Sequence, residues 1–286
     1  MVTINNVFNN ANMKCIANVG PFYVYEHQND LSVTPSGASG AYFMKEMNVR
    51  KRQVLCTLNG NNAVKVQAGA MQWTTGSVEM NANVGGVGGF FSKAVKGAVT
   101  GESAVKPLYR GQGYLMLEPT YNHILVEDVS KWGPQGMVLD DGLFFACDAA
   151  LNESVVRRQN VSSAVLGGEG LFNLCLTGNG AAVLESPVPR QELFEFVLQD
   201  DVVKIDGNMA IAWSGSLQFT VEKSTKSFLG SGLSGEGFLN VYRGSGRILM
   251  APTMAGTMNY SSNGPSQTTA TSGQSSVNDA VSSFFS

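Results

Sequence analysis

Residues 235–252 read GEGFLNVYRGSGRILMAP, in which two strand-forming runs flank the triplet GSG. The same plan occurs upstream in residues 168–186, GEGLFNLCLTGNGAAVLES, and in residues 111–129, GQGYLMLEPTYNHILVEDV. Each copy opens on G-x-G and carries a turn-like triplet between its two apolar runs. Two such runs joined by a short turn are typical of a β-hairpin. The sequence therefore predicts three copies of the same β-hairpin.

The residues that lead into the last copy, 230–235, contain a literal G-x-G-x-x-G. In a dinucleotide-binding loop this motif is followed by a helix and, about twenty residues on, by an acidic residue that binds the ribose. Here the strand-like run FLNVYRG follows, and no acidic residue stands at that distance. We therefore interpret these glycines as part of the β pattern and expect no nucleotide cofactor.

A second recurring element precedes each predicted hairpin. A strand-like run enters Gly69, Gly142 or Gly207, and an apolar residue follows two positions later. Glycine is favoured where a tight turn needs a positive φ. The glycines are 73 and 65 residues apart, which gives the length of the repeat. We predict an all-β chain with units at 1–130, 131–200 and 201–253, a Gly-rich insertion at 85–103 in the first unit, and a flexible tail at 254–286.

Composition favours a turn-rich β protein, with 33 glycines and only 14% charged residues. The net charge of −3 gives no attraction to nucleic acid. The four cysteines are far apart, as expected for buried thiols in a reducing compartment rather than for a disulfide framework or a metal site. The chain shows neither an apolar run that could span a membrane nor a secretory signal, so we expect a cytoplasmic protein.

Two peripheral segments are apolar at helical spacing. In the Gly-rich insertion these are Phe90, Phe91 and Val95, with lysines on the other side. The segment is interpreted either as a peripheral membrane contact or as a cover over a sheet edge. In the tail, Val281, Phe284 and Phe285 recur at the same spacing, and a helix this short forms only by docking on the body of the protein or on a partner.

The first fifty residues are predicted to add strands to the first unit. FYVYEH (22–27) and RKRQVLCTL (50–58) flank TPSGASG (34–40), which reads as a mobile turn. The basic triplet Arg50, Lys51 and Arg52 is isolated, so we interpret it as a solvated sheet edge.

No catalytic constellation is visible in the sequence. His123 lies near Glu127 and Asp128, but the repeat register places it in an exposed hairpin turn. Gln112, Glu169 and Glu236 occupy matching positions in the three copies. They either cap turns or converge on a pseudo-threefold axis, where they would bind a cation or another polar ligand. Three tryptophans are predicted to belong to the core rather than to a stacking platform: Trp73, Trp132 and Trp213.

Several segments together resemble the altered-inheritance-of-mitochondria family of bacterial and organellar proteins. They are VKVQAGAMQW, the Gly-rich GGVGGFFSKAVKGAVTGES, GQGYLMLEP, GLFFACDAAL and GEGFLNVYRGSGRILM. The resemblance spans roughly residues 54–252. It implies a fold similar to the tryptophan RNA-binding attenuation protein (TRAP): three tandem β-sandwich units of the double-stranded β-helix type around a pseudo-threefold axis. It carries over no catalytic residue, and the link of eukaryotic members to mitochondrial inner-membrane organisation suggests scaffolding.

The function favoured by these observations is a non-enzymatic β-scaffold that self-associates or binds a protein or membrane-associated partner. The alternative is a small-ligand- or metal-binding module whose site lies between repeats near Gln112, Glu169 and Glu236. An enzyme would need His123 or His27 to meet carboxylates that are distant in the sequence.

Overall fold

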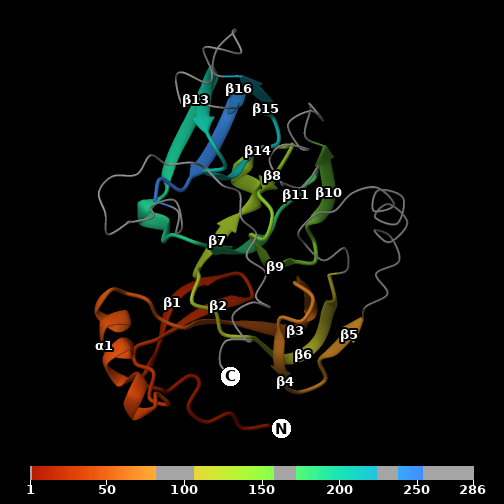
Figure 1. The fold of residues 1–286 in the computed structure, drawn as a ribbon. Helices are drawn as coiled ribbons and strands as arrows, with labels where there is room; N and C mark the ends of the chain where they lie inside the picture. The colour runs from red at the N-terminus through yellow and green to blue at the C-terminus, as the bar shows by residue number, and fades with distance from the viewer. Residues whose placement is uncertain (1, 82–105, 158–171, 224–237, 254–286) are drawn as a thin grey trace, which may run out of the picture.

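The computed structural model describes residues 2–81, 106–157, 172–223 and 238–253, and this part of the chain is built mostly of β-strands (Figure 1). The predicted all-β class is confirmed in this general form. The strands are β1 (Met13–Val19), β2 (Phe22–His27), β3 (Arg52–Val66), β4 (Met71–Thr74), β5 (Glu79–Asn81), β6 (Leu108–Leu117), β7 (His123–Asp128), β8 (Met137–Leu139), β9 (Phe144–Asp148), β10 (Asn152–Arg157), β11 (Phe172–Thr177), β12 (Ala181–Ser186), β13 (Phe194–Asp206), β14 (Ala210–Ser214), β15 (Gln218–Lys223) and β16 (Phe238–Met250). The helices in the described residues are α1 (Ala38–Glu46) and three short 3₁₀ turns, η1 (Pro35–Gly37), η2 (Val129–Trp132) and η3 (Arg190–Glu192).

The strands form two sheets. A nine-stranded sheet contains β1 to β7 with β9 and β12, and a seven-stranded sheet contains β8, β10, β11 and β13 to β16. Figure 1 shows the first sheet in the lower half of the molecule and the second in the upper half. One apolar cluster joins them, because it contains Leu139 of β8 and Leu249 of β16 together with Phe144 of β9 and Leu184 of β12. The core is therefore shared between the sheets.

The three turn glycines have the backbone conformation that the sequence predicts. Gly69, Gly142 and Gly207 have φ values of +83°, +78° and +64°. They lead into β4, β9 and β14, respectively. The strand before Gly142, β8, and the strand after it, β9, belong to different sheets. This turn therefore carries the chain from one sheet to the other.

The prediction of three hairpins is wrong. The triplet GSG lies inside β16, which runs through it as one strand. The strands on either side of GNG, β11 and β12, belong to different sheets, and β6 and β7 each pair with other strands. Opposite the GSG triplet, the pairing of β13 with β16 shifts register between Leu198 and Asp201. Glycine permits the bend that such a bulge requires, so GSG marks a bend rather than the turn of a hairpin.

The glycines of the first G-x-G, Gly111 and Gly113, allow another part of the chain to approach their backbone closely. They lie in β6 with φ values of +122° and +152°. A Cβ added at Gly111 would lie 2.1 Å from the carbonyl oxygen of Ser77, and one added at Gly113 would lie 2.0 Å from that of Thr75. The segment between β4 and β5 therefore packs directly on the backbone of β6, in a space that only glycine leaves open.

A buried ion cluster lies beside the pairing of β3 with β9. Lys65 Nζ is 3.0 Å from Glu153 Oε1 and donates to the carbonyl oxygen of Leu151 at 2.9 Å. Lys106 Nζ is 3.7 Å from Glu153 Oε2 and lies over the ring of Phe144. All three charged side chains are buried. Buried charges require such partners, so this cluster fixes how β10 sits against β3.

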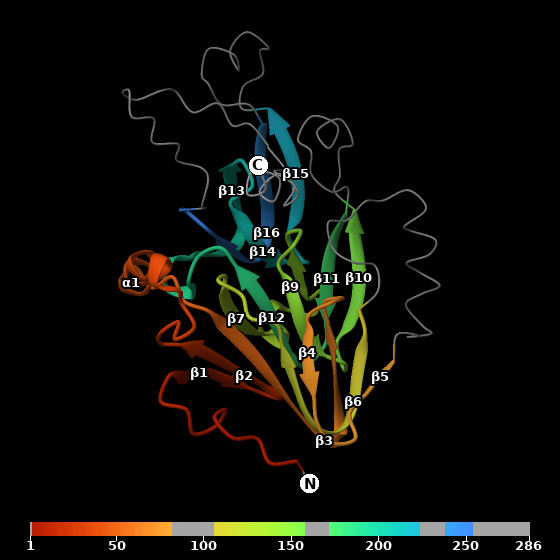
Figure 2. The same ribbon diagram turned by 60° about the horizontal axis from the view of Figure 1, so that its bottom comes forward.

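The prediction of a mobile turn at residues 34–40 is also wrong. Pro35 begins a 3₁₀ turn, and α1 follows directly from Ala38. Proline suits the first position of a helical segment because its φ is already helical. Residues 41–46, AYFMKE, are mostly adequate to good helix formers and extend the turn into a helix. In Figures 1 and 2, α1 stands at the side of the molecule, outside both sheets.

We predict that Gly111→Ala lowers the free energy of unfolding by about 2 to 4 kcal/mol, because it combines a strained φ with a clash against the Ser77 carbonyl. The measurement is urea unfolding of the full chain. Gly40→Ala is the control, because Gly40 lies in α1 with nothing within 4 Å of the added Cβ. Equal stability of the two variants would contradict the close-approach explanation.

Candidate functional site

The structure describes only part of the predicted ligand site. The side chain of Gln112 is exposed on β6, and the backbone carbonyl oxygen of Gln112 accepts a hydrogen bond from the backbone N–H of Ser77 at 2.9 Å. Glu169 and Glu236 lie outside the described residues, so their convergence with Gln112 stays a prediction. The residues of the two predicted interaction segments also lie outside the described ranges: Phe90, Phe91, Val95, Val281, Phe284 and Phe285.

The structure places His123 and the basic triplet at residues 50–52 in environments that differ from the predicted ones. His123 is the first residue of β7 and is half-buried, not exposed in a hairpin turn. Burial lowers its pKa, and the nearby Arg52 guanidinium lowers it further. The basic triplet is not a solvated edge either, because the side chain of Arg52 is only 2% exposed. These side chains belong to a structured polar region.

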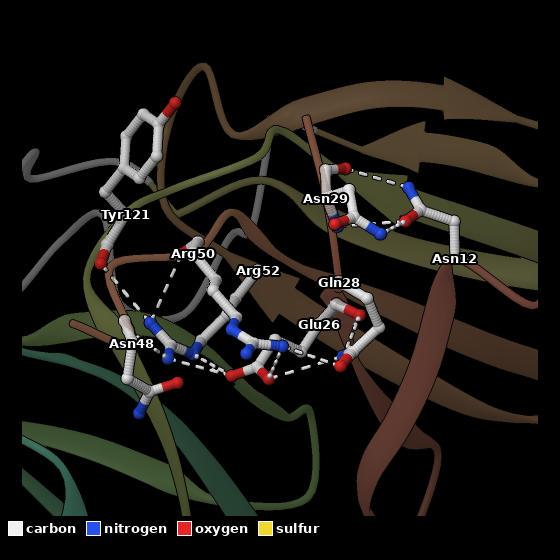
Figure 3. Close-up of polar contacts among 8 residues, drawn as sticks. All are labelled: Asn12, Glu26, Gln28, Asn29, Asn48, Arg50, Arg52 and Tyr121. Carbon is white, nitrogen blue, oxygen red and sulfur yellow. Dashed lines mark hydrogen bonds and ion pairs between the residues drawn. The ribbon is translucent and has the colours of Figure 1, made fainter. Parts of the chain in front are cut away.

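Arg52 and Glu26 form the centre of this polar region (Figure 3). The Arg52 guanidinium binds Glu26 Oε2 through Nε at 3.0 Å and Nη2 at 2.8 Å. Its remaining donors contact the carbonyl oxygens of Asn48, Arg50 and Tyr121 at 3.3 to 3.4 Å. The five donors of a guanidinium are suited to such a site, in which several acceptors surround one buried cation. Arg52 thereby ties β2, β3 and the segment before β7 together.

Arg50 approaches the same carboxylate from the other side (Figure 3). Its Nη1 lies 3.7 Å from Glu26 Oε1 and donates to Gln28 Oε1 at 2.6 Å. Its Nε is buried and has no hydrogen-bond partner. Two guanidinium groups therefore share one carboxylate, and Arg50 keeps unused donor capacity.

Lys51 and Asp30 form a separate pair beside this cluster. Lys51 Nζ lies 2.8 Å from Asp30 Oδ2. The hydrogen bond from Lys51 lowers the pKa of Asp30 to about 2, and the same bond raises the pKa of Lys51. Both side chains remain about one-third exposed, so the pair is partly screened by water.

Asp30, Arg50 and Lys51 line a cavity of about 550 Å³ between α1, the end of β2 and the start of β3. One wall is a row of hydrogen bonds in which His27 Nε2 lies 2.8 Å from Gln53 Oε1, and Gln53 donates to Gln72 at 3.0 Å. Another part of the lining comes from α1, none of whose residues is buried. The remaining lining residues include polar, charged and apolar side chains: Asn12, Gln28, Asn29, Asp30, Leu31, Ser32, Val33, Gly37, Gly40, Ala41, Met44, Lys45, Val49, Arg50, Lys51, Pro119 and Tyr121.

The sequence contains a signal for this site. Glu26 and the basic triplet lie on strands that the hydrophobic pattern already predicted, namely FYVYEH and RKRQVLCTL. Antiparallel pairing of these strands places Glu26 directly opposite Arg52. An acidic residue at the end of one strand and a basic triplet at the start of the next could have indicated an ion pair.

A second candidate site is the outer edge of β13. Within the described residues β13 pairs only with β16, so its other edge is open. Three apolar side chains on this strand are exposed: Phe194, Val197 and Val202. An open edge with exposed apolar side chains is a common place for another strand to pair.

Other kinds of site receive no support from the described residues. The described part of the chain contains no cluster of three or more His, Cys, Asp or Glu side chains that could hold a metal ion. None of its helices has the length and hydropathy needed to cross a bilayer. Burial raises the pKa of the Cys56 and Cys147 thiols, which disfavours the reactive thiolate. Trp132 and Trp213 are buried, as predicted, and Trp73 packs partly buried beside β2, β3 and β6.

We predict that Arg52→Met lowers the free energy of unfolding by about 3 to 5 kcal/mol, because it leaves Glu26 and three backbone carbonyls without their partner. Urea unfolding measures the change. Arg110→Met is the matched control, since Arg110 is exposed on β6 and its removal should change stability by less than about 0.5 kcal/mol. A loss at Arg52 no larger than the control would contradict the anchoring role.

Asp30 gives a prediction about pH. Its folded-state pKa of about 2 is below the ordinary value of 3.8, so the pair with Lys51 stabilises the fold above about pH 4. This contribution is lost as the pH falls toward 2. Thermal unfolding of wild type and Asp30→Asn should therefore differ at pH 6 and converge near pH 2, with a smaller difference at high salt. A difference that is independent of pH would contradict the assignment.

Comparison with known proteins places the chain in a family. The family model described as "Mitochondrial biogenesis AIM24" matches residues 45–253. An uncharacterised protein of Streptococcus pyogenes serotype M6 is 30% identical over 198 residues, which cover 67% of this chain and 77% of that protein. The crystal structure of another S. pyogenes protein is similar with a TM-score of 0.52 and 26% identity, over 73% of this chain and 90% of the other. Most residues that line the cavity precede residue 45 and lie outside the family match. The chain belongs to the AIM24 family.

Proposed function

We propose that this protein is a non-enzymatic β-scaffold that assembles with other copies of itself through its open strand edges. The observation that carries the proposal is the way in which strands of successive predicted units pair within the chain. The bacterial relative that it matches is itself uncharacterised, so the argument depends on the chain's own geometry.

Two junctions inside the chain follow the same rule. Residues 64–66 of β3, just before the turn glycine Gly69, pair with residues 146–148 of β9, which follow Gly142. Residues 137–139 of β8, just before Gly142, pair with residues 212–214 of β14, which follow Gly207. In each case the last strand before one turn glycine pairs antiparallel with the first strand after the next one. This regularity favours three related units.

A third junction of the same kind would join an edge of β13 to an edge of β4, both of which are unpaired within the described residues. Residues 202–204 of β13 precede Gly207 by the same interval as residues 64–66 precede Gly69 and residues 137–139 precede Gly142. Residues 73–76 follow Gly69 at the positions at which the paired residues of β9 and β14 follow Gly142 and Gly207. In the described residues β13 pairs only with β16 and β4 only with β6. The two strands lie well apart in both views (Figures 1 and 2). The partner for β13 is therefore β4 of another copy.

This contact joins two different edges, so it is head-to-tail and builds either a closed ring or an open filament. The same rule of pairing supports the finer prediction of three tandem TRAP-like units at 1–130, 131–200 and 201–253. The exposed valine at position 202, at one end of the proposed contact, supports it further.

The test uses sedimentation velocity of the full chain and two edge variants. Val202→Lys places a charge on the β13 edge, and Thr74→Lys places one on the β4 edge. We expect wild type to assemble and each variant alone to be monomeric. An equimolar mixture should form a dimer, because the intact β13 edge of Thr74→Lys pairs with the intact β4 edge of Val202→Lys.

Val156→Lys is the matched control. Val156 lies on β10, another edge strand, and is 42% exposed, against 43% for Val202. It should assemble like wild type. A wild-type chain that stays monomeric at its highest soluble concentration, or a mixture of the two variants that fails to dimerise, would refute the proposal.

A further inference from the structure

We propose that the cavity between α1 and the nine-stranded sheet binds a single-chain amphiphile with an anionic head, such as a carboxylate or phosphate monoester on an alkyl chain. This inference is independent of the self-association through β13. It rests on the charges, the apolar surface and the polar wall that meet at the cavity.

The size of the cavity suits a small molecule. Its volume of about 550 Å³ falls within the range of roughly 300 to 1,000 Å³ typical of ligand sites. Its lining comes from several separate parts of the chain: the segment before β1, the end of β2 and the loop after it, α1, the start of β3, β4, and the segment near Tyr121. Such a site is held in place by the fold rather than by one mobile loop.

The charge of the lining favours an anion. The ionised lining residues are Asp30, Lys45, Arg50 and Lys51, and the pair between Lys51 and Asp30 uses the one carboxylate among them. Lys45 forms no ion pair with any described residue. Arg50 shares Glu26 with the buried Arg52, which holds that carboxylate at 2.8 Å, whereas Arg50 remains at 3.7 Å. One carboxylate therefore faces two guanidinium groups, and the Arg50 side chain is the cation best placed to accept a further anionic partner.

The donors of Arg50 support the same conclusion. Among the described residues, Arg50 makes its contacts through Nη1, to Gln28 and Glu26, and its buried Nε has no partner there. A guanidinium binds carboxylate or phosphate through two of its donors at once, and such pairs are among the strongest hydrogen bonds in proteins. A small rotation of the Arg50 side chain would present Nη2 and Nε to an anionic head.

Part of the cavity lining is apolar and open to water. Leu31, Val33, Met44 and Val49 line it, and all four side chains are exposed. Apolar side chains exposed at the wall of a cavity gain stability when an apolar group covers them. An alkyl chain lying along α1 would do so, whereas an inorganic anion would leave them exposed. The ligand class is therefore amphiphilic.

The polar wall of the cavity determines the orientation expected for the ligand. His27, Gln53 and Gln72 are joined by hydrogen bonds of 2.8 and 3.0 Å, and Asn12 and Asn29 bond each other at 3.1 Å. Because these groups are held by one another, they present a fixed polar surface next to Arg50. The anionic head is expected at this wall and the chain at α1.

The experiment is calorimetric titration of the full-length protein with decanoate below its micelle concentration. We expect saturable one-to-one binding and a rise in the melting temperature, because a ligand that binds only the native state stabilises it. Decanol, which has the same chain without the charge, and acetate, which has the charge without the chain, should each bind at least about tenfold more weakly. Decanol or acetate binding as tightly as decanoate would overturn the proposal.

Two variants locate the site. Arg50→Gln should weaken decanoate binding about tenfold or more, as expected for loss of a charged hydrogen bond. Val33→Asp should weaken decanoate binding without changing the response to acetate. Arg110→Gln is the matched control, because Arg110 is exposed on β6 away from the cavity. Melting curves without ligand check that each variant is folded. Equal binding by Arg50→Gln and Arg110→Gln would refute the site.

A final experiment distinguishes binding of a free amphiphile from binding to a membrane surface. Vesicles of phosphatidylglycerol are tested for co-flotation with wild type and with Arg50→Gln. Flotation that depends on Arg50, together with no binding of decanoate, would overturn the single-chain ligand in favour of a lipid bilayer. Decanoate binding without flotation supports the proposal.

Discussion

The packing of two sheets on one core is the constraint on which the rest of this structure depends. Leu139 and Phe144 stand on either side of Gly142 and are both buried in the cluster that the sheets share. The positive φ at Gly142 lets the chain leave one sheet and enter the other within a few residues. Because Leu139 and Phe144 must both be buried in the shared core, the directions in which β8 enters the turn and β9 leaves it are constrained.

The polar region near α1 is built onto this core from the outside. Arg52 belongs to the part of β3 whose neighbours Val54 and Cys56 are fully buried, so its guanidinium is carried below the surface. Burial of a charge is costly unless it is paired, and Glu26 together with three carbonyl oxygens provides the pairing. The cavity follows from this arrangement, because α1 rests beside the cluster without burying any of its own residues. A surface helix with little packing of its own can be stabilised by a ligand placed between it and the sheet.

Much of the strand content could be predicted from the sequence, but the pairing could not. FYVYEH was correctly predicted as a strand, and the turn glycines have the predicted sign of φ. The three predicted hairpins were wrong because two neighbouring apolar runs carry no information about which strand each one pairs with. The site was missed for a similar reason. Arginine is usually exposed to solvent. Arg52 can be buried only because the neighbouring strand places Glu26 opposite it.

By itself the sequence determined the all-β fold class, the turns at Gly69, Gly142 and Gly207, and the family to which the chain is similar. These follow from local chemistry, since alternating apolar runs favour strands and glycine tolerates a positive φ. Only the tertiary structure decided that the G-x-G of β6 admits the backbone of residues 75–77, and that two arginines share Glu26 beside a cavity. It also decided which strand edges are unpaired within the described part of the chain. Such features depend on residues far apart in the chain meeting at contact distance, and local sequence does not specify those distances.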